Sequence, residues 1–190
     1  MKQKLVLILL LFCFKAFSQN SKFNFEANYP IAIDNNFIGR NFNGIIDLGL
    51  KYRFSDLEIV DLGVSLNAGV FKNTIEDIIQ PFDVFLFVIQ PRLFAELNLE
   101  SISKFHPFIG LGYTVINSNA RGFDSFNSPN RTSETQSGFN VNLGFALDVS
   151  DALYAQIQYD FTKINLDTNT PDIVYNTNVN ILKIGLGYRL

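Results

Sequence analysis

The chain has 190 residues and a formal net charge of −3, and 47% of its residues are hydrophobic and 14% aromatic, with no tryptophan. This length fits one domain, and the acidic balance argues against nucleic acid as a partner. A single cysteine cannot form an intramolecular disulfide, so we expect the fold to be stabilised by other means.

The first eighteen residues differ in character from the rest. Lys2 and Lys4 precede an apolar run over 5–14, and the sequence KAFSQ then places small residues at the spacing of a secretory cleavage site. The run is too short for a membrane-spanning helix. We expect residues 1–18 to be a signal peptide and residues 19–190 to form the mature domain.

A lipoprotein is the alternative interpretation of this segment. Cys13 would then become the acylated first residue, but the large side chain of Phe12 would stand where lipoprotein processing needs a small one. Cleavage after residue 18 would remove three lysines and no acidic residue, which changes the net charge from −3 to −6 and leaves no cysteine.

Apolar residues recur at every second position in eight segments of the remaining chain. The segments are 23–31, 46–54, 60–70, 85–97, 109–115, 139–149, 153–161 and 182–190. A period of two is that of a strand with one apolar face, and no helical segment is expected between the strands. The stretch 82–94 begins apolar on both faces, and Pro91 within it removes a ladder donor, which predicts a bulge or local distortion.

The connections between the eight segments alternate in length. Those after the second, fourth and sixth segments are short, whereas the others are longer. The longest, over 117–137, is polar and rich in Ser, Asn and Gly, and we expect it to be a loop. Short turns at one end and long loops at the other predict an all-β fold, an antiparallel up-and-down barrel.

The residues between the apolar ones decide which face of the barrel looks outward. Eight of the twelve glycines occupy these positions: Gly49, Gly63, Gly69, Gly110, Gly112, Gly144, Gly185 and Gly187. Glycines interleaved with charges suit the narrow interior of an eight-stranded barrel. A soluble lipocalin-like barrel would instead turn its apolar face inward around a ligand. We therefore expect a transmembrane β-barrel whose apolar face contacts lipid, with strands of about 9 to 11 residues in the membrane.

The charged residues at inward positions are expected to form a network in the lumen. Its members are Arg53, Asp61, Arg92, Glu96, Asp148, Asp160, Lys183 and Arg189, and further inward charges are Glu26, Asp47 and Lys51. Opposite charges that satisfy one another would block the lumen. The alternative is a selectivity ring in a narrow pore.

The last ten residues, ILKIGLGYRL, are expected to form the strand that closes the barrel, because a closed sheet leaves no unpaired edge in hydrocarbon. Leu186, Tyr188 and Leu190 look like the C-terminal insertion signal of bacterial outer-membrane barrels. The final residue departs from the commoner Phe.

The signal peptide, the eight segments, HPFIGLGYTV (106–115) and KIGLGYRL (183–190) together resemble the small bacterial outer-membrane β-barrel family, often called porin-family proteins. The resemblance covers residues 22–190, and the signal ending FSQ is similar to those of Bacteroidota-type Gram-negative bacteria. It implies a location in the outer membrane, with outer-membrane lipid and the barrel assembly machinery as partners. It implies no shared catalytic residues, since family members anchor, adhere or conduct poorly.

Catalytic, metal and cofactor chemistry find little support in the sequence. A barrel lipid hydrolase is a third alternative. The single histidine, His106, argues against it, because it is expected at the short-turn end, where no serine is placed to act as its nucleophile. No His/Cys cluster suggests a metal site, and the glycine pairs precede no helix, as a phosphate loop would require. We expect no catalytic residues, metal or cofactor.

The function expected from these features is a structural or surface-interaction role through long extracellular loops. Candidate contacts are Arg121, Phe123, Phe126 and Arg131 in the longest connection, for an extracellular ligand that the sequence does not identify. A narrow passive channel for small polar solutes is the alternative.

Overall fold

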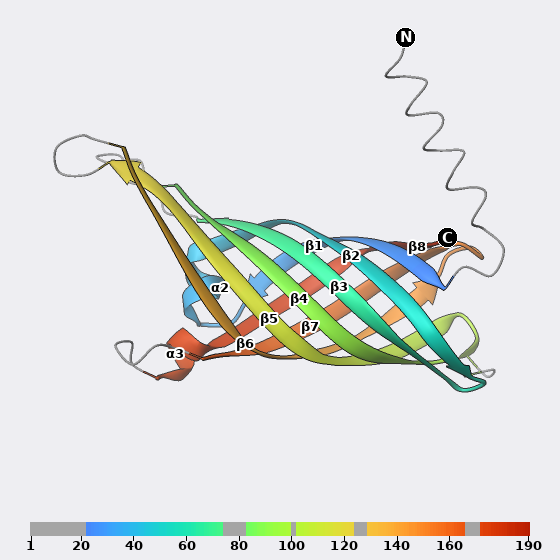
Figure 1. The fold of residues 1–190 in the computed structure, drawn as a ribbon. Coiled ribbons are helices and arrows are strands. Elements are labelled where there is room, and N and C mark those ends of the chain that lie inside the picture. Colours follow the sequence, from blue (N-terminus) through green and yellow to red (C-terminus); the bar gives the residue numbers. More distant parts are fainter. Residues whose placement is uncertain (1–21, 74–82, 100–101, 124–128, 166–171) are drawn as a thin grey trace, which may run out of the picture.

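The computed structural model describes residues 22–73, 83–99, 102–123, 129–165 and 172–190. Within them, eight antiparallel strands form one closed barrel in which each strand pairs with its neighbours in the chain and the last pairs with the first (Figure 1). The strands are β1 (Phe23–Ile33), β2 (Phe42–Leu57), β3 (Val60–Asn73), β4 (Asp83–Leu97), β5 (Phe105–Phe123), β6 (Pro129–Asp148), β7 (Leu153–Asn165) and β8 (Asn178–Arg189). This confirms the predicted eight-stranded, all-β barrel.

Side chains alternate between the outside and the inside of the barrel along each strand. In β1 the exposed Phe23 and Phe25 flank the fully buried Asn24, and in β3 the exposed Leu66 precedes the buried Asn67. An apolar outer surface around a polar interior is the arrangement that a lipid environment stabilises. The expected direction of the two faces is therefore correct.

The barrel closes between β8 and β1, as the last ten residues predicted. Leu186 pairs with Ala27 and Tyr188 with Phe25, and the Leu190 N–H donates to the Phe23 carbonyl at 3.1 Å. The same strand pairs with β7 on its other side. Both edges of β8 are thus hydrogen-bonded, which a sheet in hydrocarbon requires.

The predicted loop over 117–137 is wrong, because most of it is strand. β5 continues to Phe123 and β6 begins at Pro129, with Asn117 opposite Thr135 and joined to it by a side-chain hydrogen bond of 2.9 Å. Figure 1 shows this hairpin, coloured yellow and brown, projecting beyond the rest of the barrel. The apolar alternation ends here because polar side chains occupy both faces, although the backbone ladder continues.

Pro91 interrupts the sheet locally without shifting its register. The β3–β4 ladder runs through Pro91 opposite Leu66, whereas the β4–β5 ladder has no pair at Gln90 or Pro91 and resumes in the same register. The predicted local distortion is therefore present at Pro91, as a break in the ladder rather than a bulge. In the described ladders, register shifts lie in β2, at Gly44/Ile46 and Arg53/Ser55.

Two short helices lie at the end with the long connections, where the sequence pattern predicted none. They are α2 (Phe37–Asn41), which follows β1, and α3 (Val174–Thr177), which precedes β8 (Figure 1). Asn36 caps α2, because its side-chain oxygen accepts from the Gly39 N–H at 2.7 Å. Helices of five and four residues are too short to show a helical period in the sequence. Among the described residues, no helix has the length and apolar character needed to cross a membrane.

Candidate functional site

The middle of the lumen holds a buried network of opposite charges. Arg92 Nη2 lies 2.7 Å from Asp160 Oδ2, and Lys183 Nζ lies 2.9 Å from the same oxygen. Lys183 Nζ is also 2.8 Å from Asp47 Oδ2, so two cations and two carboxylates form one chain. All four side chains are at most 2% exposed, and at this burial a charge without a partner would be very costly.

A second buried pair completes this network. Lys51 Nζ lies 2.7 Å from Glu26 Oε1 and 4.0 Å from the centre of the Phe108 ring. Tyr154 and Gln158 donate to the two oxygens of Glu26, at 3.0 and 3.1 Å. We call the six charges the central network: Glu26, Asp47, Lys51, Arg92, Asp160 and Lys183. Its three acids balance its three bases.

A further group of charges lies nearer the short turns. Arg53 is 2.6 Å from Glu96 and 3.3 Å from Asp61, and Arg189 is 2.7 Å from Asp148. We call these five residues the short-turn cluster. The structure thus places the eight predicted lumen residues in two groups rather than one, with Arg92, Asp160 and Lys183 in the central network.

His106 belongs to the short-turn end and contacts Asp148 as well. Its two ring nitrogens lie 2.9 Å from Asn98 Oδ1 and 3.0 Å from Asp148 Oδ2. Both nitrogens are therefore occupied by partners other than a serine. In the described part of the chain, no group of three or more His, Cys, Asp or Glu residues could hold a metal ion.

Toward the long connections the lumen becomes apolar, which the sequence reasoning missed. Nine buried residues form what we call the apolar layer: Ile38, Phe42, Phe71, Leu86, Val88, Ile116, Ile164, Val179 and Ile181. Ile38 comes from α2, so this helix helps to close the barrel. Leu86 and Val88 belong to the stretch that is apolar on both faces, and the sequence signal for the layer was therefore present in β4.

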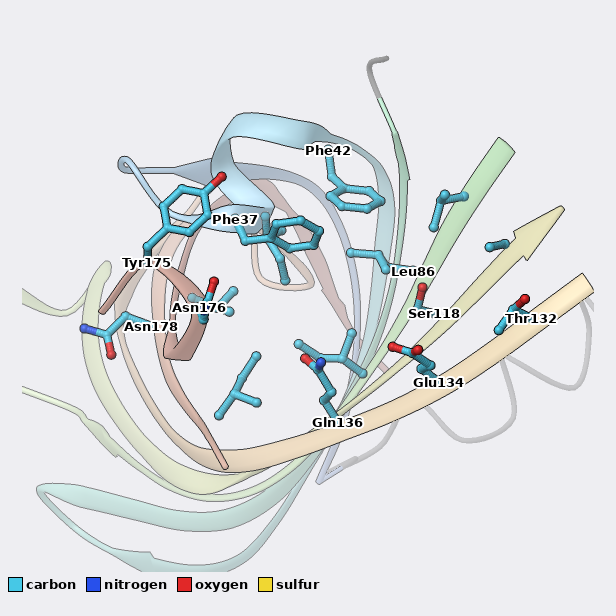
Figure 2. Close-up of a pocket in the computed structure, with 16 residues that line it drawn as sticks. Phe37, Phe42, Leu86, Ser118, Thr132, Glu134, Gln136, Tyr175, Asn176 and Asn178 are labelled. Atoms are coloured by element: carbon cyan, nitrogen blue, oxygen red, sulfur yellow. The ribbon is translucent and has the colours of Figure 1, made fainter. Parts of the chain in front are cut away.

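Above the apolar layer lies a cavity of about 430 Å³, which we call the mouth cavity. Figure 2 shows the rings of Phe37, Phe42 and Tyr175 on one side of it and polar side chains of β5 and β6 on the other. The Phe37 and Tyr175 rings meet edge to face with centroids 6.4 Å apart, which joins α2 to α3. The cavity contacts five members of the apolar layer besides Phe42: Ile38, Leu86, Ile116, Ile164 and Val179.

The candidate contacts of the longest connection lie in the hairpin rather than in a loop. Arg121 of β5 stands opposite Arg131 of β6, and both side chains are exposed. Their odd positions put them on the face opposite Ser118 and Glu134, which line the mouth cavity. Phe123 pairs with Pro129 through the backbone. The side chain of Phe123 and the whole of Phe126 lie outside the described residues.

One edge of the hairpin has no strand partner among the described residues. The β6–β7 ladder begins at Ser137 opposite Asn165, whereas residues 129–136 of β6 pair with β5 alone. Backbone groups along such an edge are free to bond water or an extended segment of another protein.

The predicted insertion signal lies on the outer face of β8 at the short-turn end. Leu186 and Tyr188 are 53% and 44% exposed, and Leu190 follows the strand directly. Arg189, which stands between Tyr188 and Leu190, points inward to Asp148.

Comparison with known proteins agrees with this architecture. Neisserial surface protein A has a TM-score of 0.60 at 17% identity, over 90% of this chain and 98% of its own. Ail of Yersinia pestis, in complex with the heparin analogue sucrose octasulfate, has a TM-score of 0.59 at 13% identity, over 90% and 97%. The N-terminal β-barrel domain of Pseudomonas aeruginosa OprF has a TM-score of 0.52 at 16% identity, over 90% and 98%.

Identities this low establish a shared fold and nothing finer. No curated protein matches the chain. The family model described as "Outer membrane protein beta-barrel domain" matches residues 5–189, nearly the whole sequence. The chain therefore belongs to the outer membrane protein β-barrel family.

Proposed function

We propose that this protein is a non-enzymatic integral outer-membrane barrel with a structural or surface-interaction role on its extracellular side. The proposal rests on the contrast between the lumen of the barrel and the β5–β6 hairpin. The lumen is filled by the short-turn cluster, the central network and the apolar layer, whereas the β5–β6 hairpin projects beyond the barrel (Figure 1).

The filled lumen favours this role over a passive channel. A permeating ion would have to separate the Arg92–Asp160 and Lys183–Asp47 pairs and then cross the apolar layer. The interior of an eight-stranded barrel is only wide enough for its own side chains. The partners of His106 likewise lend no support to a lipid hydrolase.

Planar-bilayer recording separates the surface role from the channel. We expect no regular unitary conductance steps from the purified barrel in symmetric salt. The Lys72→Met variant is the matched control, because its charge lies outside the lumen, 3.2 Å from the exposed Asp83. Regular steps in wild type and Lys72→Met that change size in Lys183→Met would establish the channel instead.

The hairpin is the part of the molecule that a surface role would use. Arg121 and Arg131 are exposed on one of its faces, and the edge of β6 above Ser137 is open among the described residues. Replacing residues 120–132 by Asn-Gly should leave a two-residue turn between the paired Asn119 and Ser133. Phe123 and Phe126 would be removed with it, and they remain candidate contacts.

Adhesion of expressing cells tests this assignment. Cells carrying the shortened hairpin should lose attachment to host-cell layers and to one another, at equal barrel levels in the membrane. Arg121→Gln/Arg131→Gln is the milder variant, which keeps the hairpin. If cells with the shortened protein attached as well as wild type, the surface-interaction role would be excluded and only a structural role would remain.

We further propose that residues 1–18 direct export and that the assembly machinery recognises Leu186, Tyr188 and Leu190. The mature protein, 19–190, should then fractionate with outer membranes and show heat-modifiable migration on gels, because a closed barrel resists unfolding by detergent. Recovery of the processed protein in the soluble periplasm would contradict this location.

A further inference from the structure

The mouth cavity has an apolar inner wall. Its floor consists of Leu86, Ile116 and Val179, each 3% or 4% exposed, and Phe71 and Ile181 of the apolar layer are buried in the same cluster. Its volume of about 430 Å³ lies in the range of small-molecule sites, about 300 to 1,000 Å³. An apolar body that entered would remove water from this wall, which is favourable.

The polar side of the cavity carries one kind of charge. Of its sixteen lining residues, Glu134 alone has a charged side chain, and the other polar groups are hydroxyls and amides such as Ser118 and Gln136 (Figure 2). The nearest basic positions of the hairpin, Arg121 and Arg131, belong to its opposite face by strand alternation. A ligand in the cavity therefore meets a carboxylate with no lysine or arginine among the lining residues to balance it.

We propose that the mouth cavity binds a small amphipathic cation, a molecule with an apolar body and one positively charged group. The apolar body packs against Phe42, Leu86 and Ile116, and the cation lies at Glu134. The rings of Phe37 and Tyr175 lie on the side of the cavity away from Glu134 and extend its aromatic wall (Figure 2). Fatty acids and lipid phosphates are disfavoured, because their charge has the same sign as the carboxylate. This site goes beyond the surface role proposed above and does not depend on it.

Three probes with one ring system and different head groups test the proposal. They are 2-(1-naphthyl)ethylammonium, the uncharged 2-(1-naphthyl)ethanol and 1-naphthylacetate, each titrated against the full mature barrel in phosphatidylcholine nanodiscs. Binding is measured by equilibrium dialysis, with empty nanodiscs subtracted, and by isoleucine methyl NMR shifts. We expect saturable binding with the ammonium tightest, about two- to fivefold tighter than the alcohol, as for an exposed ion pair, and naphthylacetate weakest.

Three variants locate the binding. Glu134→Gln should abolish the preference for the ammonium and leave the affinity of the alcohol unchanged. Ala120→Phe should fill the cavity and weaken all three probes, with barrel formation checked by heat-modifiable migration. Arg131→Gln, on the other face of the hairpin, is the control and should preserve the order of the probes.

Three results would overturn the proposal: no saturable binding above empty nanodiscs, naphthylacetate bound as tightly as the ammonium, or binding that Ala120→Phe leaves intact. None of these results bears on conductance or adhesion, so the surface role can fail or stand separately.

Discussion

Replacing Arg92 by Met should be among the most destabilising single changes in the lumen. The guanidinium contacts Asp160 at 2.7 Å and donates to Asn67 Oδ1 at 3.1 Å and to Asn140. Met fills much of the same volume but makes none of these bonds. The central network would keep three acids and only two bases.

The size of the loss in unfolding free energy depends on the contacts that Asp160 keeps. Removing one partner of a buried ion pair costs about 3 to 5 kcal/mol of unfolding free energy. Asp160 would still lie 2.9 Å from Lys183 and accept from Asn142 at 2.6 Å. We therefore expect the lower end, about 3 kcal/mol. Arg92→Met/Asp160→Asn restores the charge balance, and the double variant should be more stable than Arg92→Met alone.

Equilibrium unfolding in urea, with the barrel refolded in lipid vesicles and followed by circular dichroism and gel mobility, measures these differences. Lys72→Met is the matched control. Lys72 pairs with Asp83 at 3.2 Å, but the two side chains are 48% and 58% exposed. Loss of such a pair should cost about 0 to 1 kcal/mol.

The comparison of these two variants can refute the reasoning. If Arg92→Met cost no more than Lys72→Met, water would be screening the central network, and the lumen would be open enough to hydrate it. That result would also remove the main support for a closed barrel and favour the channel.

Three further predictions concern the wall of the barrel. Leu66→Arg, on the lipid face at the middle of β3, should lower the unfolding free energy by about 2 to 4 kcal/mol in the same assay. Ser65→Ala, which changes the neighbouring inward residue, should lower it far less, and equal effects would contradict the register. Gly187→Val should lower the unfolding free energy by about 1 to 3 kcal/mol, because a Cβ there would overlap the Tyr154 ring. An unchanged urea midpoint would show that the lumen is not tightly packed around Gly187. Deletion of residues 186–190 removes ladder bonds to both β1 and β7, so the protein should be exported but absent from outer-membrane fractions; insertion at the wild-type level would disprove the closing-strand signal.

Much of the wall of the barrel could be predicted from the sequence because strand alternation is local. The period of two placed Leu66 outside and Asn67 inside without knowledge of any partner strand. It also placed the closing strand at residues 182–190. The polar hairpin escaped this reasoning, since β5 and β6 above the barrel have no lipid face and therefore no apolar period.

Which inward residues meet was decided by the tertiary structure alone. Arg92 and Asp160 are 68 positions apart, and their contact depends on the stagger of the strands around the barrel, which alternation does not encode. The apolar layer and the mouth cavity also require Ile38 of α2 to be brought against strands from the far side of the barrel. Periodicity reports the face on which a side chain lies, whereas closure of the sheet determines its neighbours across the lumen.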